Sequence, residues 1–131
     1  MPCPYFEPLK PVPSAEVRLP LLGEFDGRCH AGADAAAVPE ALRFRCNLGY
    51  SRGLCHRFPD GERRSCLRYH VNGRTASTLH VLCIEEQNYA PSRWYQVQYP
   101  IAGDRLEPEI EDVCVRAQVL TFCRTYLERF G

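Results

Sequence analysis

The segment Cys46-Asn-Leu-Gly-Tyr-Ser-Arg-Gly-Leu-Cys55-His-Arg-Phe-Pro59 carries two cysteines in a stretch rich in turn-forming residues. Two further cysteines, Cys3 and Cys29, precede it, and all four lie close to a glycine or a proline. Loops of this kind can bend around a metal centre, and four thiolates complete the ligand set of a tetrahedral ion or of an iron–sulfur cluster. We therefore expect Cys3, Cys29, Cys46 and Cys55 to bind one metal cofactor.

The length and composition are those of one folded domain, with 131 residues of which 45% are hydrophobic. A chain of this size buries roughly two thirds of its unfolded surface, so its core needs no disulfides. The eight cysteines therefore call for another explanation. The start of the chain, Met1 to Pro8, lacks the basic and apolar regions of a signal peptide. No apolar run approaches the roughly 20 residues of a membrane span.

These features bear on the compartment and the partners. In the reducing cytoplasm, a cysteine-rich pattern indicates metal binding or catalysis more often than disulfides. Sixteen basic and sixteen acidic residues cancel, and no basic stripe is present that could follow a phosphate backbone. We expect a cytoplasmic protein that binds neither membrane nor nucleic acid. The alternative is a mature secreted domain with four disulfides.

The fold class predicted from the pattern is α+β, as a single domain over residues 1–131. Residues 1–60 are expected to be an irregular metal-binding half, and residues 61–131 a meander plus a helix. Six prolines in the first 20 residues exclude helix and central strand there, so this stretch should run extended over the surface.

Local signals predict the elements around the cysteines. Asp26-Gly27 indicates a turn just before Cys29, because this pair tolerates positive φ. Pro39 suits the first position of a short helix that runs to about Asn47, and Gly49 is a natural stop for it.

In the second half, residues 66–71 and 93–99 alternate between apolar and polar side chains, which predicts two strands. Between them, residues 78–86 form a nearly continuous apolar run, which suits a central strand covered on both faces. The short links between them, one of them a turn within residues 71–77, favour an antiparallel meander. Pro108 suits the start of a C-terminal helix that lies across the meander and closes the core. Apolar residues follow at helical spacing, namely Ile110, Val113, Cys114, Ala117 and Leu120.

The remaining cysteines, Cys66, Cys83, Cys114 and Cys123, lie inside these regular elements. Free cysteine is one of the most buried residue types and packs as a small hydrophobe. We expect these four thiols to fill the core and to take no part in metal binding.

The spacing of the four candidate ligands bears on the metal. Structural zinc usually uses cysteines two to four residues apart, whereas gaps of 25, 16 and 8 residues separate these. Such gaps suit a larger centre, and Cys3 is followed by Pro4, as is the last cysteine of bacterial ferredoxin runs. We expect a [4Fe–4S] cluster, with zinc or no metal as the alternatives. Three nearby arginines could offset the thiolate charge, Arg28, Arg52 and Arg57.

The pattern Cys46…Tyr50-Ser-Arg52…Cys55-His-Arg-Phe58-Pro59 resembles the Cys…Tyr…Arg…Cys…Phe-Pro stretch of the YkgJ-like family of zinc- or iron-chelating cysteine-cluster domains. The match covers fourteen residues of 131. Its first gap is one residue shorter, Gly53 stands where the family has proline, and the family's closely spaced upstream cysteines have no counterpart. The resemblance implies metal chelation by Cys46 and Cys55 and is silent about the rest of the chain.

The function expected from these patterns is that of a small metal-binding protein with a redox, sensing or structural role. A redox role needs a protein partner, since no second cofactor site is visible. No catalytic residues are indicated, and the protein is expected not to be an enzyme. His30 and His56 each follow a candidate ligand and could replace a thiol. The alternative is a metal-free interaction module or accessory subunit whose cysteines only pack.

Overall fold

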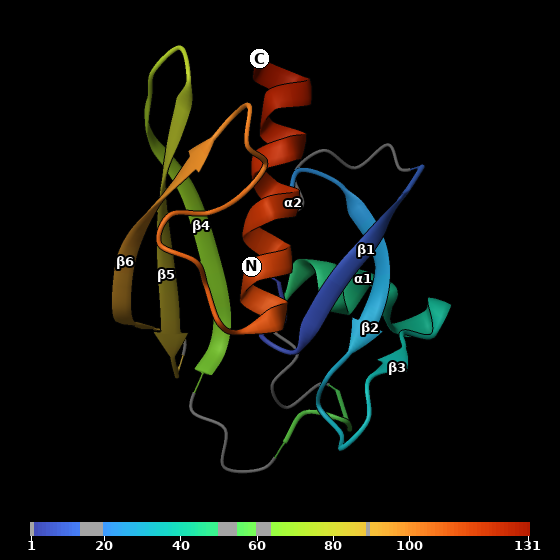
Figure 1. Cartoon of the computed structure of the whole chain (residues 1–131). Helices are drawn as coiled ribbons and strands as arrows, with labels where there is room; N and C mark the ends of the chain where they lie inside the picture. Colours follow the sequence, from blue (N-terminus) through green and yellow to red (C-terminus); the bar gives the residue numbers. More distant parts are fainter. Residues whose placement is uncertain (1, 14–19, 50–54, 60–63, 89) are drawn as a thin grey trace.

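The computed structural model describes residues 2–13, 20–49, 55–59, 64–88 and 90–131. This part of the chain forms two three-stranded antiparallel sheets and two helices, with the sheets in sequential strand order (Figure 1). The first sheet consists of β1 (Phe6–Val12), β2 (Glu24–Cys29) and β3 (Ala36–Ala37), and the second of β4 (Arg64–Arg74), β5 (Thr78–Gln87) and β6 (Ala90–Pro100). The helices are α1 (Glu40–Leu48) and α2 (Val113–Phe130). The α+β class, the meander and the C-terminal helix are thus confirmed.

Helix α2 lies between the two sheets, with the meander on one side and β1 and β2 on the other (Figure 1). Its buried side chains, among them Val115, Val119 and Phe122, are at most 5% exposed and belong to one core shared with both sheets. The ring of Phe122 packs against that of Tyr69 on β4 at a centroid distance of 5.9 Å. The helix therefore closes the core against the meander, as expected, and against a first sheet that the sequence pattern did not predict.

The most buried polar residue of the helix, Gln118, joins the three layers. It is 0% exposed, and its Nε2 donates to the carbonyl oxygens of Cys3 at 2.8 Å and Phe6 at 2.7 Å. Its Oε1 accepts from the hydroxyl of Tyr69 at 2.6 Å. All three partners are thereby satisfied away from water, where an unpaired group costs about 1–3 kcal/mol.

The predicted start of the last helix at Pro108 is wrong. The backbone of Glu107 exchanges hydrogen bonds with Gln98 on β6, so this stretch is held against the meander instead of coiling. The helix begins five residues later, after Asp112, whose carboxylate accepts from the backbone N–H groups of Cys114 and Val115. The buried face turns accordingly, and Val113 of the predicted stripe is 42% exposed.

The N-terminal half is not irregular, because β1, β2 and β3 form a sheet there. Strand β1 contains Pro8 and Pro11 and lies at the edge of this sheet, the position in which missing N–H donors are tolerated. The expected turn at Asp26-Gly27 is also wrong, since both residues belong to β2. Gly27 is needed there because a Cβ would collide with the carbonyl of Glu7 on β1.

Two other local predictions are confirmed. The short helix is confirmed as α1, and Gly49 ends it with φ 87° and an N–H bond to the Arg45 carbonyl. The turn expected within residues 71–77 is confirmed, although β4 continues to Arg74 with a shift in register between Val71 and Gly73. The reversal comes at Thr75, whose hydroxyl accepts from the N–H of Thr78 at 3.1 Å.

We expect Gln118→Met to lower the free energy of unfolding by about 2–4 kcal/mol, because it leaves two carbonyls and one hydroxyl buried without partners. Gln96→Met, at an exposed position of β6, is the matched control and should change stability by less than about 0.5 kcal/mol. Urea unfolding followed by circular dichroism measures both. Equal midpoints for the two variants would show that the buried amide does not hold the layers together.

Candidate metal centre

The four cysteines singled out by their surroundings come from four separate segments. Cys3 precedes β1, Cys29 ends β2, Cys46 lies near the end of α1, and Cys55 follows in the next described loop. All four line one cavity of about 20 Å³, here called the thiol cavity. Its other lining residues are Tyr5, Ala31, Leu42, Arg45, Arg57 and Phe58.

Helix α1 is placed beside β2 by the side chain of Asn47, which is 0% exposed. Its Oδ1 accepts from the N–H of Phe25 at 2.8 Å, and its Nδ2 donates to the Phe25 carbonyl at 2.9 Å. The amide thus pairs with β2 as a neighbouring strand would. Because Asn47 follows Cys46 directly, this pairing holds the Cys46 turn of the helix against the strand that carries Cys29.

The loop of Cys3 is held from two sides. Its N–H donates to the carbonyl of Cys46 at 3.0 Å, and its own carbonyl accepts from Gln118 at 2.8 Å. An edge-to-face contact between Tyr5 and Phe58, 5.6 Å between centroids, closes the wall beside it. Cys3 is buried, whereas Cys29, Cys46 and Cys55 are half-buried.

The thiols affect one another electrostatically. Burial, together with the charges of Cys3, Cys29 and Cys55, raises the pKa of Cys46 to about 12, while the charge of Arg57 acts in the opposite direction. Four thiolates in one cavity therefore repel each other unless a bound cation balances their charge. Metal binding at such a site releases protons and is favoured as the pH rises.

The positions of the histidines and arginines refine the predicted surroundings. His30 bonds through Nε2 to the carboxylate of Glu7 at 2.8 Å, and neither His30 nor His56 is among the residues that line the thiol cavity. Of the predicted arginines, Arg57 lines the cavity, Arg28 does not, and Arg52 lies outside the described residues.

The cation that sequence reasoning missed is Arg45. It follows Leu42 by one helical turn on α1, so both face the cavity with Cys46. This spacing was readable from the sequence.

The other four cysteines are buried in the core, as predicted: Cys66, Cys83, Cys114 and Cys123 are at most 4% exposed. The thiol of Cys66 donates to Oε1 of Glu86 at 3.2 Å. Burial raises the pKa of Cys83 and of Cys123 to about 12. None of the eight cysteines, all of which the structure describes, is in a disulfide.

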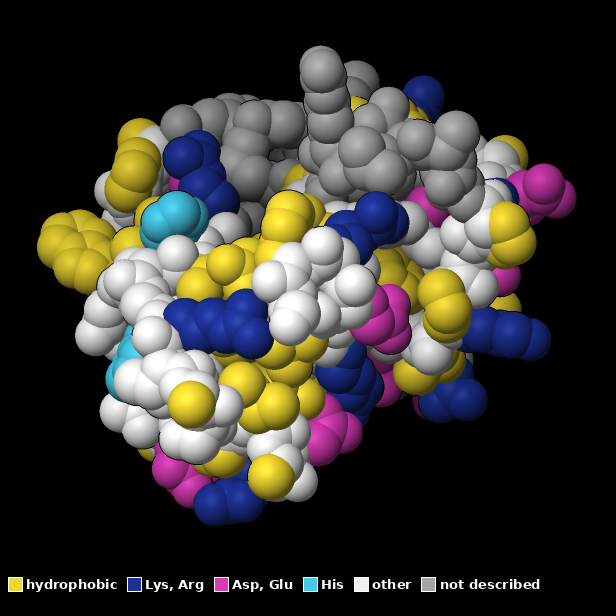
Figure 2. Space-filling view, turned by 90° about the horizontal axis from the view of Figure 1, so that it is seen from above, with side chains coloured by type: hydrophobic (Ala, Val, Ile, Leu, Met, Phe, Trp, Pro, Cys, Tyr) yellow, Lys and Arg dark blue, Asp and Glu magenta, His cyan; other side chains and the backbone are white. Residues whose placement is uncertain are grey.

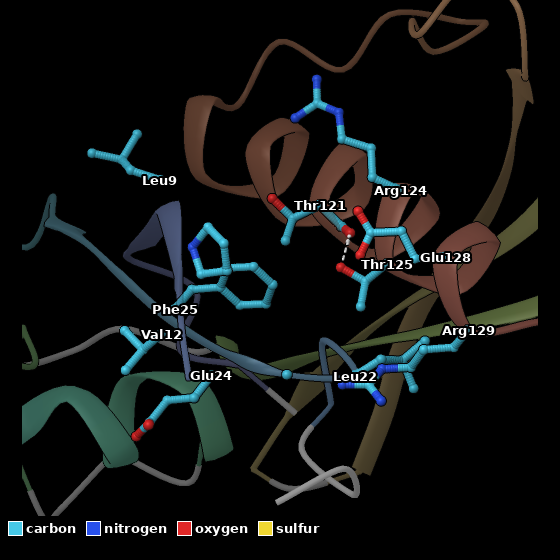
Figure 3. A pocket seen from close by; sticks show the side chains of 12 residues that line it. Leu9, Val12, Leu22, Glu24, Phe25, Thr121, Arg124, Thr125, Glu128 and Arg129 are labelled. Carbon is cyan, nitrogen blue, oxygen red and sulfur yellow. Dashed lines mark hydrogen bonds between the residues drawn. The ribbon is translucent and has the colours of Figure 1, made fainter. Parts of the chain in front are cut away.

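A second cavity, of about 240 Å³, lies between the first sheet and the C-terminal half of α2 (Figure 3). Phe25, Leu22 and Val12 form its apolar wall, and Arg124 and Glu128 line it from the helix. Hydrophobic side chains are visible between Lys and Arg side chains on the face seen in Figure 2, which looks down on the C-terminal end of α2. This cavity contains no cysteine or histidine among its lining residues.

The raised thiol pKa values make the stability of the metal-free protein depend on pH in the alkaline range. Cys46, Cys83 and Cys123 keep their protons to a pH near 12 when folded but lose them near 9.0 when unfolded. The folded state then binds more protons than the unfolded state, so the free energy of unfolding falls as the pH rises from about 9 to about 12. Urea titrations of metal-free protein at pH 7, 9 and 10.5 measure this, and a midpoint independent of pH would contradict it.

Within the described residues, no helix is long and apolar enough to cross a membrane. Comparison with known proteins finds no family model, curated protein or solved structure that matches the chain.

Proposed function

We propose that this protein binds one [4Fe–4S] cluster through Cys3, Cys29, Cys46 and Cys55. The observation that carries the proposal is that four thiols from four distant segments line one cavity. Core packing would not require this convergence, since the remaining four cysteines are dispersed over β4, β5 and α2. The local resemblance of residues 46–59 to cysteine-cluster domains agrees with metal binding.

A cluster and a single ion require different separations of the four thiols. In a zinc site each sulfur lies about 2.3 Å from the metal, so the sulfurs approach one another to about 3.8 Å. Among the described residues, no group of three or more His, Cys, Asp or Glu side chains is arranged to hold a metal ion. In a [4Fe–4S] cluster each thiolate binds a different iron, which allows the four sulfurs to stay farther apart.

Zinc remains the second candidate metal, because the thiol cavity of about 20 Å³ has the size of one ion or water. A metal-free interaction module is the remaining candidate. It is favoured by Trp94 on β6, which at 68% is the most exposed of the large hydrophobic side chains in the described residues. Tyr95 beside it stacks with Arg93 at 4.9 Å.

Four cysteine ligands leave no open position on the cluster, so substrate cannot bind its iron. We therefore infer a role in electron transfer, redox sensing or structural support rather than catalysis. An electron-transfer or sensing role requires a protein redox partner, and we propose no nucleic-acid or membrane partner. The eight thiols fit the reducing cytoplasm, where a cluster of this kind would persist.

Anaerobic purification with iron, sulfide and zinc analysis tests the cofactor. We expect about four iron and four sulfide per chain with broad absorption near 400 nm, and a serine substitution at Cys3, Cys29, Cys46 or Cys55 should lower the iron content. Cys83→Ala and Cys123→Ala are the matched controls, because they remove buried thiols elsewhere. They should cost stability through lost packing but leave iron unchanged. Equal iron in all variants would refute the ligand assignment, and stoichiometric zinc without iron would select the second candidate.

The charge of Arg57 bears on the redox potential of the cluster. Reduction adds negative charge, which a neighbouring guanidinium stabilises, so we expect Arg57→Gln to lower the midpoint potential while the iron content stays the same. Arg74→Gln is the control, because Arg74 lies at the far end of β4 and bonds to the carbonyl of Phe130. Anaerobic redox titration measures both, and equal potentials would exclude electrostatic tuning by Arg57.

A further inference from the structure

Strand β6 forms an outer edge of the meander (Figure 1). The backbone N–H and C=O of Gln98 point away from β5, because they bond to Glu107 at 2.8 and 2.9 Å. In an antiparallel strand, every second residue directs these groups to the same side. Those of Trp94 and Gln96 therefore also point away from β5, and among the described residues none is bonded to them there. This part of the edge is open to a further strand.

A groove of about 510 Å³ lies beside the open edge, on the face of the meander that packs against α2. Arg93, Tyr95 and Val97 line it from β6, and residues 108–112 line it from the segment that leads into α2. Successive side chains of a strand alternate between the two faces of a sheet. Every second side chain of a strand added to this edge would therefore enter the groove.

The groove is acidic. Four carboxylates line it, those of Glu85, Glu109, Glu111 and Asp112, and Arg93 is the only cation among its lining residues. Arg93 lies 3.8 Å from Glu85, and Arg116, just outside, lies 3.9 Å from Glu109. Even with both guanidinium groups counted, two net negative charges remain. Among the described residues, Glu111 has no cationic partner.

The side chains of the open edge are of the types that dominate binding interfaces. Arg93, Trp94 and Tyr95 follow one another, and Trp, Tyr and Arg are the residues enriched at binding hot spots. Trp94 is 68% exposed on the face that points away from α2. Arg93 lies over the ring of Tyr95 on the groove side. Both faces of the edge thus offer contacts to an added strand.

We propose that the open edge of β6 binds an extended, basic segment of a partner protein, which adds an antiparallel strand to the meander and places cationic side chains in the acidic groove. In this mode of recognition, main-chain hydrogen bonds supply affinity and side-chain pockets supply specificity. The interaction involves no metal, so it is independent of the proposed cofactor.

The antiparallel register predicts which partner residues face β6. Partner residues opposite Trp94 and Gln96 exchange hydrogen bonds with them and have side chains on the same face as Trp94. The partner residues in between direct their side chains into the groove and their N–H groups away from β6. A peptide with alternating side chains therefore separates backbone pairing from charge.

The probe is a synthetic peptide of about eight residues, within the usual length of a strand, that alternates threonine with lysine. Trp94 is the only tryptophan of the chain, so its fluorescence reports on this edge. We expect a saturable blue shift and weaker quenching by acrylamide, both reduced by added salt. The same peptide with glutamate in place of lysine should bind about tenfold more weakly or less. No change with the lysine peptide, or equal affinity of the two peptides, would overturn the proposal.

Backbone methylation of the peptide tests strand addition. N-methylation of the threonines removes the donors that face β6 and should weaken binding by about tenfold or more. N-methylation of the lysines alters groups that face away from β6, so it should change the affinity by less than about twofold. Equal losses for the two methylated peptides would overturn the antiparallel strand.

Variants of the protein locate the site. Gln96→Pro removes one N–H of the edge, which an edge strand tolerates, and should abolish the fluorescence change. Glu111→Gln should weaken binding by about two- to fivefold. Glu128→Gln is the matched control, since this exposed carboxylate lies near the end of α2 and outside the groove. Equal effects of the two glutamate variants would overturn the assignment to the groove. A blue shift that grows with protein concentration alone, with a dimer in sedimentation, would show that a second copy covers the edge instead.

Discussion

The arrangement of the whole domain depends on one buried amide. Gln118 lies in the middle of α2, fully enclosed, and its two ends bind backbone carbonyls on one side and the Tyr69 hydroxyl on the other. Without the amide, each of these groups would be buried away from water with no hydrogen-bond partner. The hydrophobic effect is non-directional, whereas hydrogen bonds require defined distances and angles. The amide therefore selects one placement of the helix between the two sheets.

The same constraint reaches the thiol cavity, because one carbonyl that Gln118 binds belongs to Cys3. On the other side of the cavity, Asn47 fixes α1 to β2 with a comparable pair of hydrogen bonds. Two buried amides thus bring together thiols that are more than 40 residues apart in the sequence. Ligand position and folding are coupled in such an arrangement, so cofactor binding would contribute to the stability of the whole domain.

The eight cysteines lie in two kinds of surroundings that the sequence chemistry alone does not distinguish. Cys83 and Cys123 lie within the core, where burial keeps the thiols protonated and inert. The four of the thiol cavity lie at the edge of the core, with Arg45 and Arg57 beside them and a solvent-facing cavity next to Cys29. Cations and partial access to water stabilise a thiolate, so these four thiols are easier to deprotonate than those of the core.

The sequence alone determined the meander and helix α1, and it grouped Cys3, Cys29, Cys46 and Cys55 as one set. The signals for these features, namely hydrophobic patterns, helix-end residues and nearby Gly or Pro, act over only a few positions of the chain. It did not reveal the first sheet, since proline argues against a strand unless the strand lies at an edge, and only the pairing of β1 with β2 shows that edge. The pair Asp26-Gly27 looks like a turn in the sequence because the group that requires a glycine there, the carbonyl of Glu7, lies twenty residues away. Pro108 looks like a helix start because the sequence does not show the backbone hydrogen bonds between Glu107 and Gln98. The tertiary structure decided these points, because each depends on a partner distant in sequence.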